Sequence, residues 1–321
     1  MTFSASSLLA RAAGNQATQV NPSLADIDLT TSGSSFLWFV FTVMAATAIG
    51  TSVWAFTTVE PHRRVFHFLT IAILTTASVA YFGMASNLGE TPVQVEFIRE
   101  GGAILAQNGG RLTRGIWYAR YIDWTITTPL LLLEILLVSG VPTSTILLTI
   151  FMDIVMIVTG LVGALVPSTY KWGFFSIGCV AMFFVFWILY GPAHTSAKSI
   201  SADNGKVYFR GAIALCFLWF LYPIAWGLAD GGNVISTDGE MVFYGVLDLL
   251  AKPVFAIYHL WALRSSNFAF IAPGTAPDAG SHGTSTGHGR ADGQNYGGVD
   301  QAQSSALPKR HSAAATDATI A

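Results

Sequence analysis

Long stretches of apolar residues recur seven times along the chain. A membrane-spanning helix needs about 20 consecutive apolar residues, and each stretch is long enough to provide them. A closed β-barrel is the other way to cross a bilayer, but its strands would alternate apolar and polar positions, and these stretches do not. The pattern therefore predicts an all-α membrane protein, a seven-transmembrane-helix bundle with spans at 36–57, 65–88, 116–138, 143–166, 172–192, 207–229 and 240–264.

The two ends of the chain have a different composition. Residues 1–34 are rich in Ser, Thr, Ala and Asn, and most of residues 266–321 are Gly, Ser, Ala, Asp and His. Segments of this kind bury too little apolar surface to offset the entropy lost on ordering. We therefore expect a disordered N-terminal segment at 1–34, one seven-helix domain at 35–265 and a disordered tail at 266–321.

Composition narrows the class of protein further. Of the 321 residues 11% are charged, whereas soluble domains carry about 25%. The formal net charge of −2 gives no basic surface for nucleic acid. Two cysteines, Cys179 and Cys216, lie inside apolar stretches and form neither a disulfide framework nor a zinc motif. We therefore expect a lipid bilayer as the surroundings, no nucleic-acid partner and no metal.

Basic residues between the spans indicate the orientation. The connections after the first, fifth and seventh spans carry slightly more basic residues than those on the opposite side. By the positive-inside rule the more basic side is cytoplasmic, which makes the N-terminus extracellular and the tail cytoplasmic. The residues on the predicted cytoplasmic side are Arg63, Arg64, Lys198, Lys206 and Arg264, and those on the opposite side are Arg99, Arg111, Arg114 and Lys171.

Charged residues inside the spans carry the most information about function. Each one costs on the order of 3 kcal/mol at the centre of a helix. Pairing between helices explains one or two such residues, but six are concentrated on the third, fourth and seventh spans. They are Arg120, Asp123, Glu134, Asp153, Asp248 and Lys252.

The spacing of these residues places them on shared helix faces. Arg120 and Asp123 are three positions apart, and Asp248 and Lys252 are four apart, so each pair shares one face. Glu134 follows Asp123 by eleven positions, which returns to nearly the same direction about 16 Å further along the helix. A lysine among carboxylates at this depth is a candidate functional site.

A buried lysine in its neutral form can form a Schiff base with an aldehyde. The protonated product is a cation that needs an anionic partner, which Asp123 and Asp248 can supply, while Arg120 offsets the surplus negative charge. A polyene aldehyde would also require flat aromatic surroundings. Candidates for these are Trp124, Trp219, Tyr222 and Trp226.

Three stretches resemble the helix motifs of microbial (type 1) rhodopsins. Residues 120–130 (RYIDWTITTPL) resemble the third helix, residues 219–226 (WFLYPIAW) the sixth and residues 247–252 (LDLLAK) the seventh. The resemblance covers about residues 35–265, and the stretch at 226–231 (WGLADG) is most similar to fungal members. It implies an internal pocket in which all-trans retinal is covalently attached to Lys252 as a protonated Schiff base, in a protein of the plasma membrane.

The resemblance also implies roles for individual residues. Asp123 would be the primary counterion and proton acceptor, Asp248 the second counterion, Arg120 the gating residue, Glu134 the proton donor, and Glu240 and Asp230 the proton-release pair. After Asp123 accepts its proton, Arg120 would swing outward towards the release pair. The retinal pocket would comprise Tyr81, Trp124, Thr127, Thr128, Leu131, Asp153, Met156, Gly160, Phe175, Gly178, Trp219, Tyr222, Pro223 and Trp226.

Within the family, outward proton pumps carry an acid at the first of three positions on the third helix and another acid at the third. In this chain the three positions are Asp123, Thr127 and Glu134. Chloride pumps lack the first acid, and sensory forms usually lack the last. We therefore expect a light-driven outward proton pump, an ion transporter and not an enzyme, with protons and internal waters as its partners. A photosensory rhodopsin with a slow photocycle is the alternative. A retinal-free seven-helix protein is disfavoured by Lys252, and the formation of a homo-oligomer is left open.

Overall fold

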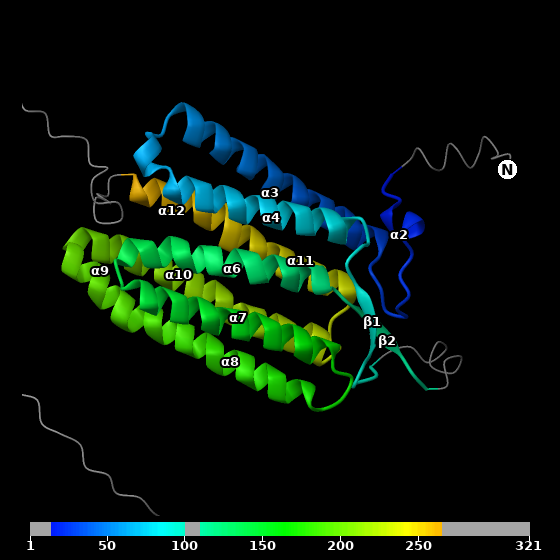
Figure 1. The fold of residues 1–321 in the computed structure, drawn as a ribbon. Helices are drawn as coiled ribbons and strands as arrows, with labels where there is room; N and C mark the ends of the chain where they lie inside the picture. Colours follow the sequence, from blue (N-terminus) through cyan, green and yellow to red (C-terminus); the bar gives the residue numbers. More distant parts are fainter. Residues whose placement is uncertain (1–13, 100–109, 265–321) are drawn as a thin grey trace, which may run out of the picture. The chain divides into compact units, whose positions relative to one another are not determined.

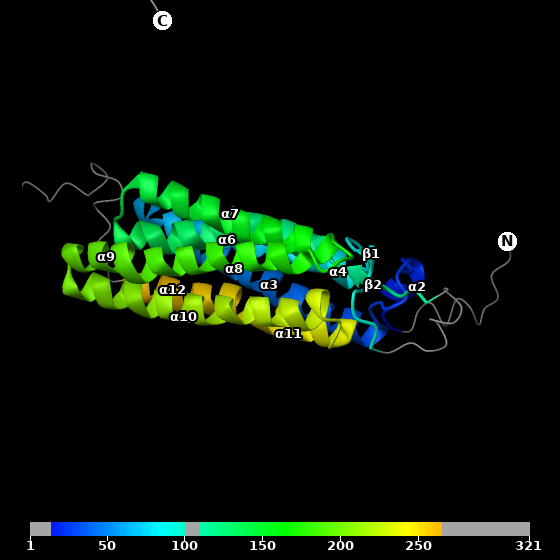
Figure 2. The same ribbon diagram turned by 90° about the horizontal axis from the view of Figure 1, so that it is seen from below.

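The computed structural model of the chain describes residues 14–99 and 110–264 (Figure 1). Within these residues, seven helical segments are long and apolar enough to cross a membrane, which confirms the predicted all-α membrane fold and makes the chain an integral membrane protein. The first four are α3 (Thr31–Thr57), α4 (Val65–Ala85), α6 (Tyr118–Ser139) and α7 (Thr143–Leu165). Figures 1 and 2 show the spanning helices side by side in one bundle.

The last three spans each contain a π-helical turn. The fifth consists of α8 (Lys171–Ile188), η2 (Leu189–Ala193) and α9 (His194–Ile200), and the sixth of α10 (Ala202–Trp226) and η3 (Gly227–Gly231). The seventh consists of α11 (Thr237–Leu249), η4 (Leu250–Val254) and α12 (Phe255–Leu263). Such wider turns are frequent at functional sites, and η4 contains Lys252.

The fifth and sixth spans are longer than predicted. The apolar pattern predicted an end of the fifth span at residue 192, which is a proline, and proline removes a helical hydrogen bond. The π-helical turn η2 accommodates Pro192, and the helix continues to Ile200. Ser201 then caps the next helix by accepting a hydrogen bond from Asn204 N, so the sixth span begins at Ala202 instead of 207.

The bundle is apolar on its outside and mixed in its interior. Large side chains such as Phe56, Trp187 and Phe217 are exposed on the helices, as expected for surfaces that face lipid. The buried residues include all six charged residues that the sequence placed within the spans. These six charged side chains therefore lie between the helices, where they can contact one another.

A β-hairpin joins the second and third spans, in a region that the sequence analysis treated as a loop. Strand β1 (Thr91–Gln94) pairs antiparallel with β2 (Thr113–Ile116), with Val93 opposite Arg114. The single pairing of Ile27 with Arg114 adds a short parallel contact. This arrangement fixes Arg114 at the end of the bundle from which α6 begins.

The N-terminal segment differs from the expected disorder over residues 14–34. The segment begins with a short helix, α2 (Ala17–Val20). Polar side chains of the residues after α2 form hydrogen bonds with other parts of the structure. The Asp26 carboxylate accepts hydrogen bonds from Thr113 N and Oγ1. The Asn21 side chain donates to the main-chain oxygen of Ser86, and the Asn87 side chain donates to the main-chain oxygen of Asn21. The composition of the segment offers little apolar surface to bury, and hydrogen bonds between side chains and the backbone hold it in place instead. Residues 1–13 and the predicted tail at 266–321 lie outside the described residues.

Candidate functional site

The centre of the site is an ion cluster between the third and seventh spans. Lys252 Nζ lies 2.6 Å from Asp123 Oδ2 and 3.0 Å from Asp248 Oδ2, and all three side chains are buried. Removing one member of a buried ion pair leaves an uncompensated charge. The two carboxylates therefore hold the amine in place, and together they exceed it by one negative charge.

The two carboxylates differ in their other partners. Asp248 accepts hydrogen bonds from Tyr81 at 2.8 Å and from Tyr222 at 2.6 Å, so both of its oxygens are bonded. Asp123 Oδ1 has no hydrogen-bond partner among the described residues. Because a protonated carboxyl group needs a free oxygen position, Asp123 is the better placed of the two to accept a proton from Lys252.

A cavity adjoins this cluster. The charged side chains in its wall are Asp248 and Lys252, and the other lining residues are mostly aromatic or aliphatic. Eleven of the residues predicted for the pocket lie in the cavity wall with Lys252 and Asp248. They are Trp124, Thr128, Leu131, Met156, Gly160, Phe175, Gly178, Trp219, Tyr222, Pro223 and Trp226. An apolar wall with one amine fits a polyene aldehyde such as retinal.

Three residues predicted for the pocket lie outside its wall. Tyr81 bonds Asp248, and Thr127 Oγ1 donates to the main-chain oxygen of Asp123. Asp153 accepts a 2.7 Å hydrogen bond from Thr128 and so links α7 to α6. These side chains support the wall from behind and do not line it.

The cavity also contains residues that the sequence analysis did not place there. Some follow from helix geometry: Tyr121 precedes Trp124 by three positions, and Met182 follows Gly178 by four, so each shares a face with a predicted residue. Tyr244 is four positions before Asp248 on the seventh span, so the same spacing places it on the face of Asp248. The additional lining residues are Tyr121, Ile157, Cys179, Met182, Tyr244 and Ala251.

Glu134 lies in the other half of the third span, about 16 Å from Asp123 along the helix. It is fully buried, and its Oε1 accepts a hydrogen bond from Thr70 Oγ1 at 3.3 Å. Its Oε2 has no partner among the described residues. Buried apolar residues of α6 such as Leu131 and Leu132 lie along the helix between Asp123 and Glu134. Glu134 is thus an isolated carboxyl group that can hold a proton.

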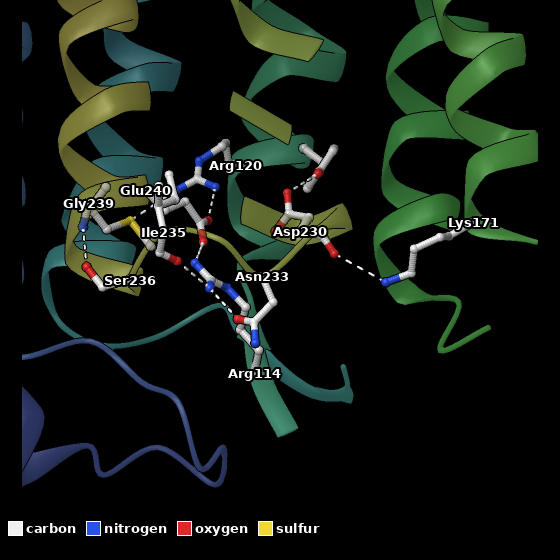
Figure 3. A network of polar contacts seen from close by, with 11 residues as sticks. Arg114, Arg120, Lys171, Asp230, Asn233, Ile235, Ser236, Gly239 and Glu240 are labelled. Atoms are coloured by element: carbon white, nitrogen blue, oxygen red, sulfur yellow. Dashed lines mark hydrogen bonds and ion pairs between the residues drawn. The ribbon is translucent and has the colours of Figure 1, made fainter. Parts of the chain in front are cut away.

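A second buried ion cluster occupies the end of the bundle near the hairpin (Figure 3). Arg120 Nη1 lies 2.6 Å from Glu240 Oε1, and Arg114 Nη2 lies 2.7 Å from Glu240 Oε2. The Arg120 guanidinium also lies over the Tyr244 ring, 4.1 Å from its centroid. Arg120 thus already contacts Glu240 in this structure, and the outward swing expected after Asp123 accepts its proton stays a prediction.

Asp230 lies apart from this double arginine contact. Its Oδ2 accepts a hydrogen bond from Tyr121 at 2.8 Å, and Lys171 Nζ donates to its main-chain oxygen at 3.3 Å (Figure 3). Asp230 Oδ1 has no partner among the described residues. The structure thus places Asp230 and Glu240 at the same end of the bundle, but with different hydrogen-bond partners.

Comparisons with known proteins agree with this site. The family model described as "Bacteriorhodopsin-like protein" matches residues 32–266. Protein FDD123 of Trametes versicolor is 45% identical over 294 residues, which cover 87% of this chain and 99% of FDD123.

Solved structures of ion pumps also match. The light-driven proton pump LR (Mac) of Leptosphaeria maculans is 36% identical with a TM-score of 0.67, covering 73% of this chain and 97% of LR. Halorhodopsin, a light-driven chloride pump, is 27% identical with a TM-score of 0.63, covering 72% of this chain and 94% of halorhodopsin.

Members of this family bind retinal through a lysine Schiff base and act as light-driven transporters or sensors, not as classical enzymes. The apolar cavity beside a buried amine meets the requirement for this cofactor. With the family model matched from the first span to the last, the chain belongs to the bacteriorhodopsin-like family and is a microbial (type 1) rhodopsin of the fungal kind.

Proposed function

We propose that this rhodopsin is a light-driven outward proton pump with all-trans retinal attached to Lys252. The observation that carries the proposal is the order of ionisable groups along the bundle. Glu134 lies on one side of Lys252 and Asp123, and the cluster of Arg120, Glu240 and Asp230 lies on the other. A chain of proton-binding groups through the membrane interior is what a proton pump requires.

When bound to Lys252 in the apolar cavity, retinal would supply the absorption of visible light and a light-driven change of shape. Asp123 accepts the proton from Lys252 Nζ, because its Oδ2 lies 2.6 Å away and its Oδ1 is free of partners among the described residues. Asp248 is less well placed to accept it, since both of its oxygens already accept hydrogen bonds from tyrosines. The transfer neutralises Asp123 and leaves the nitrogen without a proton.

Glu134 then provides the replacement proton to Lys252 Nζ. Its one hydrogen bond, donated by Thr70, is long at 3.3 Å and its second oxygen has no partner among the described residues, so little stabilises the ionised form and Glu134 holds its proton until this step. Apolar residues between Glu134 and the ion cluster keep the two apart until the helices move. Glu134 is refilled from the cytoplasmic side.

On the opposite side, the proton leaves through the cluster of Arg120, Glu240 and Asp230. Loss of the negative charge on Asp123 changes the electrostatic balance around Arg120, which lies one helical turn away on the same face. The distribution of basic residues between the spans supports an extracellular position for this end and hence outward transport in the plasma membrane. Moving one proton against 100 mV costs about 2.3 kcal/mol.

A carboxylate at Asp123 argues against chloride transport of the kind named for halorhodopsin. An anion carried past Lys252 would have to occupy the place where Asp123 and Asp248 already surround the amine at 2.6 and 3.0 Å. Two buried carboxylates would repel a third anion there.

The test is to express the full chain with retinal in cells, illuminate them and record the external pH. The proposal predicts acidification that a protonophore abolishes. The Lys252→Ala variant, expressed to the same level, should give a flat trace. A flat trace from coloured wild-type protein, with a slow photocycle, would instead support a photosensor and refute the pump.

A further inference from the structure

Two arginines from different parts of the chain hold Glu240. Arg120 belongs to the third span and bonds Oε1, whereas Arg114 belongs to strand β2 and bonds Oε2 (Figure 3). The side chains of Glu240 and both arginines are at most 2% exposed. Hydrogen bonds between ionised groups are roughly twice as strong as neutral ones, and a proton on either oxygen of Glu240 would displace one of them.

Arg114 is anchored independently of Arg120. Its Nη1 donates to Asn233 Oδ1 at 2.8 Å and to the main-chain oxygen of Ile235 at 2.7 Å. Its main chain is fixed by the pairing of β2 with β1. Arg114 therefore stays on Glu240 whatever Arg120 does during a transport cycle.

Asp230 can hold a proton without losing any of these bonds. Its Oδ1 is buried and has no partner among the described residues, and its Oδ2 accepts only the Tyr121 hydroxyl among them. The nearby cation, Lys171, donates to the main-chain oxygen and not to the carboxyl group. Lys171 interacts electrostatically with Glu96 as well as with Asp230, so Asp230 is not its sole acidic partner.

We propose that Arg114 keeps Glu240 ionised throughout and thereby makes Asp230 the group that holds and releases the proton at this end. The inference rests on the proposed pump function and identifies its exit group. The other ionisable groups that act on these two carboxyls are Arg120 and Tyr121 from α6, Tyr244 from α11, and Glu90, which precedes β1.

The release step follows from fixed charges, without a swing of Arg120. When Asp123 gains a proton, a negative charge near Arg120 disappears, and the positive cluster then favours an ionised Asp230. The O–H bond of Asp230 breaks, the electron pair stays on the carboxylate, and the proton passes to water outside. At the end of the cycle the proton on Asp123 refills Asp230, so that one proton is released in each turnover.

The dark state provides a test that does not depend on pumping. Infrared spectra of the purified full chain, with and without retinal, are compared between wild type, Asp230→Asn, Arg114→Gln and Arg114→Lys. The proposal predicts that Asp230→Asn removes a carboxylic-acid C=O band. In the double variant that combines Arg114→Gln with Asp230→Asn, a carboxylic-acid band should remain, because Glu240 then takes up the proton. Arg114→Lys, which keeps the charge, should behave like wild type.

Proton release timed with a pH-sensitive dye adds a kinetic readout. Asp230→Asn and Arg114→Gln should delay release about tenfold or more, equivalent to about 1.4 kcal/mol in the barrier, while Arg114→Lys stays close to wild type. A band that persists in Asp230→Asn with Arg114 intact, or loss of the band from the double variant of Asp230→Asn with Arg114→Gln, would overturn the assignment. If wild type releases no proton at all, the pump proposal fails, but the dark-state bands still decide between Asp230 and Glu240.

Discussion

Asp123 and Lys252 are 129 positions apart in the chain, yet a 2.6 Å hydrogen bond joins their side chains in the middle of the bundle. The contact joins the third span to the π-helical turn of the seventh. Asp248, one helical turn before Lys252, completes the pair of carboxylates around the amine. In the proposed pump, this contact is the point at which a proton leaves the amine, and Asp123 is the group that receives it.

Replacement of Asp123 by Asn should abolish transport while leaving the pigment in place. Asn keeps the shape of the side chain but cannot accept a proton, and positioned acid–base groups contribute 10²–10⁴-fold in rate. We expect the light-driven pH change to fall by about 10²-fold or more, and the absorption band to move to longer wavelength because an anion beside the cation is lost. Asp203→Asn, in an exposed pair with Lys206, is the control and should pump normally.

Replacement of Glu134 by Gln should slow the return of the proton to Lys252 Nζ. Loss of the donor should lengthen this phase by about 10²-fold, and added azide, a small diffusible acid, should restore it. Thr70→Val removes one hydrogen bond, worth about 1 kcal/mol, that Thr70 donates to Glu134. Because that bond favours the ionised carboxylate, its loss should slow the return of the proton several-fold. Flash spectroscopy measures both. An unchanged return phase in Glu134→Gln would rule out Glu134 as the donor.

Glu90, in the loop before β1, should make the hairpin end of the bundle sensitive to pH. Burial raises the pKa of Glu90 above its ordinary value, and the nearby carboxylates of Asp28 and Glu240 add to the rise. The folded state therefore loses stability as the pH rises from below 4.5 through the pKa of the folded protein. Glu90→Gln should raise the melting temperature at pH 7 but not at pH 4. An equal effect at both pH values would contradict this account.

Gly245 on α11 should be intolerant of even a methyl group. A Cβ there would lie 2.6 Å from Phe36 Cε1 and 3.3 Å from Val40 Cγ2, both on α3. Overpacking of this kind costs about 1–3 kcal/mol, so Gly245→Ala should lower the melting temperature. Gly50→Ala is the matched control, since nothing lies within 4 Å of a Cβ at that position, and it should raise stability by up to about 1 kcal/mol. Equal melting temperatures for the two variants would show that α3 and α11 pack less closely than described.

The sequence predicted the bundle because apolar periodicity is local, and it predicted the members of the central ion cluster because charged residues inside apolar spans are conspicuous and the helix motifs resemble a known family. Apolar length identified the spans, and spacing of three or four positions placed Asp248 with Lys252 and Arg120 with Asp123. Cavity residues on the same helix faces, such as Tyr121 and Met182, could have been found by extending that argument.

The features that the sequence did not predict depend on contacts between distant segments. The hairpin strands are only four residues each and hold Arg114 through pairing, which no helical period indicates. The extension of the fifth span past Pro192 depends on a π-helical turn, and the contacts of residues 14–34 depend on main-chain acceptors. The position of Arg120 on Glu240 is set by a partner 120 positions away.

Photocurrent under voltage clamp tests the central claim most directly, using cells that express the full chain with retinal. The account predicts an outward current under light that persists when chloride and sodium are replaced by impermeant ions and that disappears in Lys252→Ala. No stationary current from coloured protein, or a current that vanishes with chloride, would contradict it.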